Sequence, residues 1–218
     1  IVRAQQITGT RGAPGIAIGT IHLLSGNDLE EVVDRECLDS GLELNKFQDA
    51  LQSCRAELEL GAQSLGGHLP GDVSSIFSVY NMLLHSDEII GAVENGILQG
   101  NWAPGALRAT ISDYATRFES MEDPYLRLRA EDVRNIGNKI YAKLSGKTQA
   151  VDESQNLILT GNLISITDIA RYQREQLSGI ICQSGSSLSH TAVLANALGL
   201  PAVMAVSYTH LTLPTIYS

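Results

Sequence analysis

One histidine, His190, stands in a sequence context that suits reversible phosphoryl transfer. It follows a run of small and hydroxyl residues at 185–189 and opens a segment with the composition of a helix. A neutral imidazole is nucleophilic near pH 7, because the ordinary pKa of histidine is about 6.5. The amides and the positive end of a helix N-terminus favour the anion that forms. The residues therefore predict a phosphohistidine at the start of a helix.

Three neighbours could support a phosphate at that point. Gly185 permits close backbone approach of a donor, Ser189 could cap the helix or bond a phosphate oxygen, and Thr191 adds a first-turn hydroxyl. Gly199 and Pro201 predict where the helix ends. A lone histidine is more often a surface residue or a hydrogen-bonded core residue, and that alternative stays open on the residues alone.

The composition excludes several other classes of protein. The chain has 218 residues, is 44% hydrophobic and 18% charged, and carries a formal charge of −9. The negative charge disfavours nucleic acid and suits a basic protein partner, although an acidic surface explains it equally well. Cys37, Cys54 and Cys182 show no Cys-x-x-Cys spacing, which favours a reduced, cytoplasmic setting. No apolar run reaches the ~18 residues that a membrane span needs.

The histidines do not predict a metal site. They are scattered along the chain without His-x-x-His or Cys/His spacing, at His22, His68, His85, His190 and His210. His22, His68 and His85 are expected to be surface or turn residues. Because the chain starts at Ile1 rather than Met, we expect it to be cut from a longer protein.

Residues 31–149 are predicted to form an all-helical unit of four or five helices. Apolar residues spaced three and four apart recur through the segment, which is typical of helices with one buried face. Ser86 predicts an N-cap and Pro104 a helix start. A last long helix is expected over 124–144. Expected inward-facing residues include Phe47, Leu51, Tyr80, Ile89, Val93, Leu107, Ile111, Tyr114, Phe118, Leu126, Val133, Ile136 and Ile140.

The two ends of the chain are predicted to form one discontinuous α/β domain, from residues 1–30 and 150–206. Residues 12–24 indicate a turn and then a strand, and further strands are expected at 156–160, 179–182 and 201–206. A helix is expected over 168–176. The fold class is therefore α/β plus all-α, with the helical unit inserted into the α/β domain.

Three segments together resemble enzyme I of the phosphoenolpyruvate-dependent phosphotransferase system. Residues 185–203 resemble its phosphohistidine motif, with matches at Gly185, Ser189, His190, Ala195, Gly199, Pro201, Ala202 and Val203. Residues 12–19 are similar to its Ser-Pro-Gly-Ile-Ala-x-Gly opening, and residues 123–137 to its Tyr-Leu-x-x-Arg-Ala-x-Asp-Val-Arg-Asp-Ile-Gly stretch. The form of the segment around His190 is more similar to the nitrogen-related paralogue than to the sugar-transport enzyme.

The resemblance implies a mechanism and a domain plan. The matching histidine of a swivelling α/β domain takes phosphate from phosphoenolpyruvate, which binds with Mg²⁺ on a separate C-terminal barrel. It then passes the phosphate to a histidine on HPr or an HPr-like carrier. Because the barrel is absent, the resemblance implies a monomer that keeps only the half reaction with the carrier.

The helical insert is, by resemblance, the carrier-docking domain. Tyr125, Arg129 and Arg134 match its signature helix, and Arg129 is expected near the docking face. On the residues alone, an ion pair of these arginines with Glu131 or Asp132 is at least as strong an explanation. Thr167 is the nearest candidate for a threonine that orients the family's histidine.

The sequence departs from the family pattern at several positions, and two alternatives stay open beside the resemblance. Ser186 replaces a glycine, Leu188 stands where a hydroxyl residue is frequent, and Ala205 replaces another glycine. Residues 207–218 do not resemble the family and are taken as foreign, so His210 has no role. One alternative is the phosphohistidine domain of a pyruvate-phosphate dikinase or phosphoenolpyruvate synthase. The other is a docking module in which His190 is idle.

Overall fold

A computed structural model describes residues 6–24, 28–64, 71–146, 153–162, 164–187 and 189–206. The chain divides into two compact units, an α/β unit of Ile1–Leu24 with Asp152–Ser218 and a helical unit of Ser25–Val151. Mixed helix and sheet confirm the predicted fold class. Within the described residues, no helix is long and apolar enough to cross a lipid bilayer.

The helical unit has two helices that begin where the sequence predicts a start. It contains η1 (Leu29–Glu31), α1 (Ser40–Ser64), α2 (Gly71–Leu84), α3 (Asp87–Leu98), α4 (Ala103–Glu119), α5 (Pro124–Arg127) and α6 (Arg129–Leu144). Ser86 caps α3 by accepting from the Ile89 amide at 3.3 Å, and Pro104 lies in the first turn of α4. Both predicted helix starts are therefore confirmed.

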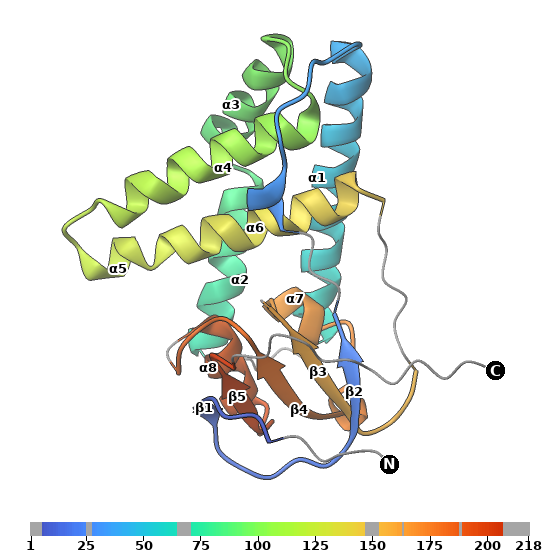
Figure 1. Cartoon of the computed structure of the whole chain (residues 1–218), viewed down its shortest axis with the longest axis vertical. Coiled ribbons are helices and arrows are strands. Elements are labelled where there is room, and N and C mark those ends of the chain that lie inside the picture. The colour runs from blue at the N-terminus through green and yellow to red at the C-terminus, as the bar shows by residue number, and fades with distance from the viewer. Residues whose placement is uncertain are drawn as a thin grey trace. The chain divides into compact units, whose positions relative to one another are not determined.

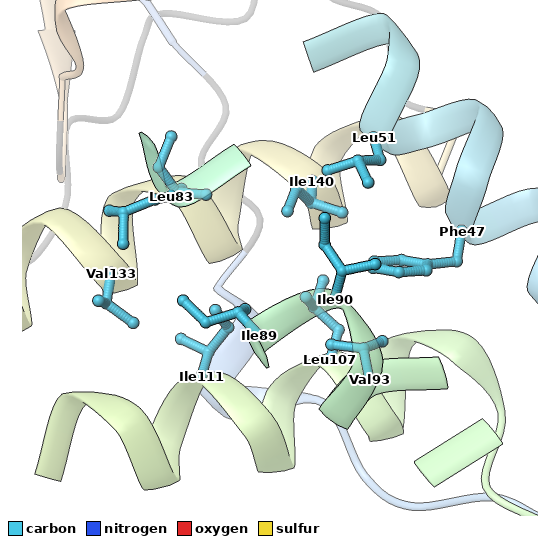
Figure 2. A pocket seen from close by; sticks show the side chains of 11 residues that line it. Phe47, Leu51, Leu83, Ile89, Ile90, Val93, Leu107, Ile111, Val133 and Ile140 are labelled. Carbon is cyan, nitrogen blue, oxygen red and sulfur yellow. The ribbon is translucent and has the colours of Figure 1, made fainter. Parts of the chain in front are cut away.

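An apolar seam holds the helices together (Figure 2). Phe47, Leu51, Leu107 and Val133 are buried, and the cavity between these side chains measures only about 10 Å³. That volume is near the lower limit for one water molecule, so the seam is a packed core and not a ligand site. Within this unit, α4 and α6 lie side by side and α5 forms the turn between them (Figure 1).

Three details of the helical prediction are wrong. The expected single helix over 124–144 is divided at Leu128, which lies between α5 and α6. Leu126 is exposed rather than inward, because it belongs to the short α5 turn and not to the buried face of α6. Tyr114 and Phe118 are only half-buried, and Tyr114 directs its hydroxyl to Glu88 at 2.8 Å. The small Ala115 fills the buried position of this turn instead.

The α/β unit contains one sheet with the strand order β1-β5-β4-β3-β2. Its strands are β1 (Thr10–Ala13), β2 (Thr20–Leu23), β3 (Leu157–Gly161), β4 (Leu177–Cys182) and β5 (Ala202–Met204). β2, β3, β4 and β5 run parallel to one another, and β1 runs antiparallel to β5. The sequence predicts one strand near the amino end, whereas the structure has two, at opposite edges of the sheet.

The predicted helix over 168–176 is also wrong. The chain forms α7 (Ile166–Ile169) and η2 (Arg174–Gln176), separated by a bend. Tertiary partners explain the break. The Tyr172 hydroxyl meets His22 Nε2 at 3.0 Å, and Arg174 donates to the carbonyls of Leu198 and Gly199 at 2.6 and 3.0 Å. A continuous helix would carry these side chains away from those partners.

Candidate functional site

His190 is the first residue of α8 (His190–Ala197), which connects β4 to the parallel strand β5. The loop before α8 leaves the sheet at the carboxyl end of β4. Ligands of parallel α/β sheets bind at this end of the strands, where the helix N-termini also gather. α8 packs against β1 and β5, so the sheet fixes the direction of its N-terminus. The start and the end of this helix are confirmed, with Gly199 at a φ of +63° after its last turn.

Backbone geometry fixes the loop before His190. Gly185 has a φ of +95°, and a Cβ there would lie 3.0 Å from Met204 Cε and 3.2 Å from Ser189 Oγ. Residues with a side chain rarely adopt this conformation. The loop also bonds to the end of β3, since the Ser184 amide donates to the Asn162 carbonyl at 2.9 Å. Two adjacent strand ends therefore hold the loop in place.

Ser189 acts as the N-cap of α8. Its buried hydroxyl donates to the Ser186 carbonyl at 2.8 Å and accepts from the Ala192 amide at 3.4 Å. Of the two roles considered for this hydroxyl, the structure shows capping. Its proton is engaged within the loop, so the side chain holds the turn that presents His190.

Thr191 ties α8 to the segment that follows β3. Its buried hydroxyl donates to the Ile164 carbonyl. The backbone N–H of Thr191 donates to no acceptor within the described part of the chain. In this arrangement the amide, rather than the hydroxyl, is the group of Thr191 that is suited to an incoming anion.

Thr167 lies in α7, after the carboxyl end of β3. It is buried, and its hydroxyl lies 2.9 Å from the Ser165 hydroxyl. Ser165 and Asp168 form a capping box that fixes this short helix. Two capped helix starts, those of α7 and α8, therefore lie at the carboxyl ends of neighbouring parallel strands. Leu188 lies outside the described residues, as do His68, His210 and the tail at 207–218.

The imidazole of His190 is half-buried, and its Nδ1 atom is enclosed by protein. Cys182 ends the strand that leads into the site, but burial raises the pKa of its thiol to about 12. A thiol with that pKa supplies almost no thiolate near pH 7, so Cys182 is a poor competing nucleophile. The described residues bring no three His, Cys, Asp or Glu side chains together as metal ligands.

The predicted docking residues lie in the helical unit and differ in their surroundings. Tyr125 projects from α5 with 61% of its surface exposed, beside the exposed Leu126 and Leu128. Arg129 is largely shielded and bonds Asp132 Oδ2 at 2.8 Å, which confirms the expected ion pair. Arg134 bonds Glu119 at 2.6 Å and Glu30 at 3.3 Å, so it links α6 to α4 and η1.

Sequence reasoning missed several residues of the two sites. The sequence pattern predicts Arg174 only as part of a helix, whereas its guanidinium donates to carbonyls at the end of α8. The pattern indicates Asp132 as an ion-pair partner but does not predict its complete burial. The spacing of three residues between Arg129 and Asp132 indicates that they can pair. No local pattern indicates that Asp132 is buried.

Two family models match most of the chain. The PEP-utilising enzyme N-terminal model matches residues 8–129, which is more than half of the chain. The PEP-utilising enzyme mobile-domain model matches residues 154–214. The second match passes Val206 and enters the segment taken as foreign, so the foreign origin of the tail stays a prediction.

Relatives with established names agree with this assignment. The phosphoenolpyruvate-protein phosphotransferase of Staphylococcus carnosus is 30% identical over 92% of this chain and 35% of its own length. A Salmonella typhimurium protein named "Phosphoenolpyruvate-dependent phosphotransferase system" is 28% identical over 93% of this chain and 27% of its own. The chain thus spans about a third of the length of the first relative and about a quarter of the second.

Two solved structures have the same fold. The N-terminal domain of "Enzyme 1 - Nitrogen" has a TM-score of 0.68 at 26% identity, covering 94% of this chain and 85% of that one. A solution structure of enzyme I has a TM-score of 0.70 at 28% identity, covering 92% and 82%. With the family models, the helical unit and the helix start at His190, these likenesses show that the chain belongs to the PEP-utilising enzyme N-terminal family.

Proposed function

We propose that His190 carries a phosphoryl group and exchanges it with an HPr-like phosphocarrier. The position of His190 supports this most directly, because it is the first residue of a capped helix at the carboxyl ends of the parallel strands. Enzyme I relatives carry names that state protein phosphotransfer from phosphoenolpyruvate. In this proposal the chain forms the phosphohistidine domain and the carrier-docking domain of such an enzyme.

The proposed step is an in-line transfer between two imidazoles. The N–P bond of the carrier's phosphohistidine breaks as His190 forms a new N–P bond, and the carrier's imidazole leaves with the electron pair. Since Nδ1 of His190 is enclosed, we assign the new bond to Nε2. The Thr191 amide and the positive helix end stabilise the phosphoryl oxygens. Gly185, with its φ of +95°, allows the turn that presents His190.

Phosphoenolpyruvate and Mg²⁺ belong, in this proposal, to the part of the enzyme that the relatives have beyond the matched third. The described residues gather no group of ligands that fits Mg²⁺, so we derive no step through the metal. The cytoplasmic setting is proposed on the reduced cysteines, which are all free. We also propose the nitrogen-related branch, supported by the form of the His190 segment and by the likeness to the nitrogen enzyme.

The test is transfer of labelled phosphate from two phosphorylated carriers, HPr and its nitrogen-branch relative. The chain should acquire acid-labile phosphate, and His190→Ala should acquire none. His85→Ala is the matched control, because His85 is an exposed histidine of the helical unit and should accept normally. Carrier binding without any transfer would identify a docking module instead. Equal or faster charging by HPr would contradict the nitrogen branch.

A further inference from the structure

We propose that Asp132 is a positioning residue for carrier docking, which acts through Arg129 to hold the exposed ring of Tyr125 in one orientation. This inference rests on the proposed function, because it specifies how the docking surface is prepared for the carrier. Three side chains form the connection, which we call the docking relay: Asp132, Arg129 and Tyr125. It lies entirely within the helical unit, at the join of α5 and α6.

The inner end of the docking relay is a fully buried carboxylate. Asp132 is 0% exposed, and its Oδ2 accepts from Nη1 of Arg129 at 2.8 Å. An ionised carboxylate is costly to bury unless it is paired and hydrogen-bonded. The pair therefore restricts Arg129 strongly, since release of its guanidinium would leave a charge inside the protein.

Two contacts couple Arg129 to Tyr125. The guanidinium carbon lies 4.5 Å from the centroid of the Tyr125 ring, and Nη2 bonds the Tyr125 hydroxyl. The first contact fixes the face of the ring and the second fixes its tip. An exposed tyrosine otherwise samples several rotamers, so the two contacts reduce that freedom.

Exposure increases outward along the docking relay. The side chain of Asp132 is 0% exposed, that of Arg129 is 16% exposed, and Tyr125 as a residue is 61% exposed. Tyr125, rather than Arg129, is thus the member that a partner can cover. Tyrosines are common anchors at protein interfaces, and the exposed Leu126 and Leu128 follow this one along the chain. Holding such an anchor in its bound rotamer lowers the entropy cost of association.

The competing explanation is an ordinary helix ion pair. Aspartate and arginine three residues apart commonly stabilise a helix weakly, with no role in binding. α4 offers a matched comparison. Asp113 pairs with Arg117 at 2.7 Å, and Arg117 lies 5.1 Å from the Tyr114 ring, but both charged side chains are more than half exposed. The control has the same residue types without the buried carboxylate.

The test is a double-mutant cycle, read as the Kd for the HPr-like carrier. Asp132→Asn should weaken binding about 3–10-fold, and Tyr125→Ala should weaken it more than about tenfold. In the Tyr125→Ala background, Asp132→Asn should have no further effect. An unchanged loss in that background would overturn the proposal, because Asp132 would then act without the ring. Asp113→Asn should leave the Kd unchanged.

A second measurement needs no partner. NMR relaxation of the Tyr125 ring should show increased motion in Asp132→Asn and in Arg129→Met, with Tyr114 as the internal reference. A ring equally ordered in both variants would overturn the docking relay. Arg129→Met interrupts the same connection should Asp132→Asn fail to fold. A chain whose ring responds but which binds no carrier would refute the proposed function and leave the relay intact.

Discussion

The helical unit and the α/β unit position their functional groups by different means. In the helical unit, side chains position these groups. Apolar side chains pack the helices together, and a buried carboxylate holds an arginine that contacts an exposed tyrosine. In the α/β unit, the backbone positions His190, through a glycine with positive φ and a capped helix start. A surface for a protein partner needs shaped side chains, whereas an anion needs amides and close approach.

The largest expected effect tests whether side-chain packing sustains the helical unit. Phe47→Ala should lower the free energy of unfolding by about 3–5 kcal/mol, because the buried ring would leave a cavity in the seam. Leu60→Ala, at an exposed position of the same helix, should change it by less than about 0.5 kcal/mol. Urea unfolding followed by circular dichroism measures both. Similar losses for the two variants would contradict the role of the seam.

The next effect tests whether backbone conformation sustains the site at His190. Gly185→Ala should lower the free energy of unfolding by about 1–3 kcal/mol, because alanine rarely adopts a φ of +95°. It should also slow phosphoryl acceptance. Gly91→Ala on α3 is the control, since a Cβ there meets no atom within 4 Å. It should stabilise the helical unit by about 0.5–1 kcal/mol. Thermal unfolding and a transfer assay give the two readouts, and unchanged transfer in Gly185→Ala would break the comparison.

The two capping serines sharpen the comparison, because the same substitution is made in each unit. Ser189→Ala and Ser86→Ala should each lower the free energy of unfolding by about 1 kcal/mol, since each removes an N-cap hydroxyl. Only Ser189→Ala should also slow phosphoryl acceptance, because its hydroxyl holds the loop before His190. Thermal midpoints and transfer rates separate these outcomes. Equal transfer rates in the two variants would show that the cap does not position the imidazole.

The smallest effect concerns pH and the helical unit alone. Burial opposes the shift, but hydrogen bonds from Lys46 and from the Ala103 amide lower the pKa of Glu43 below 4.5. A lowered pKa in the folded state adds stability above the ordinary pKa, and this stability is lost as pH falls through the folded value. Glu43→Gln should therefore lower the free energy of unfolding by about 1 kcal/mol at pH 7, and this loss should shrink as the pH falls below the ordinary pKa of glutamate. Thermal midpoints across that range would show a constant difference if the carboxylate is irrelevant.

Local patterns predicted most of the helical unit because its helices carry their own signals. Ser86 and Pro104 mark starts, and the three-and-four spacing marks buried faces such as Phe47 and Leu51. The prediction was wrong at Leu126 and at Tyr114 and Phe118. There a break at Leu128 and a small alanine at the buried position decided which residues face inward.

The amino-acid sequence by itself determined where His190 stands, at the first residue of a helix between a small-residue loop and Gly199, because caps and stops act over a few residues. Only the tertiary structure decided which groups surround that histidine and how the side chain of Tyr125 is held. β1 pairs with β5, which lies near the other end of the sequence. Arg174 donates to a carbonyl at the end of α8, and Asp132 is fully buried. Each of these outcomes depends on partners distant in sequence, and no local pattern of residues encodes such contacts.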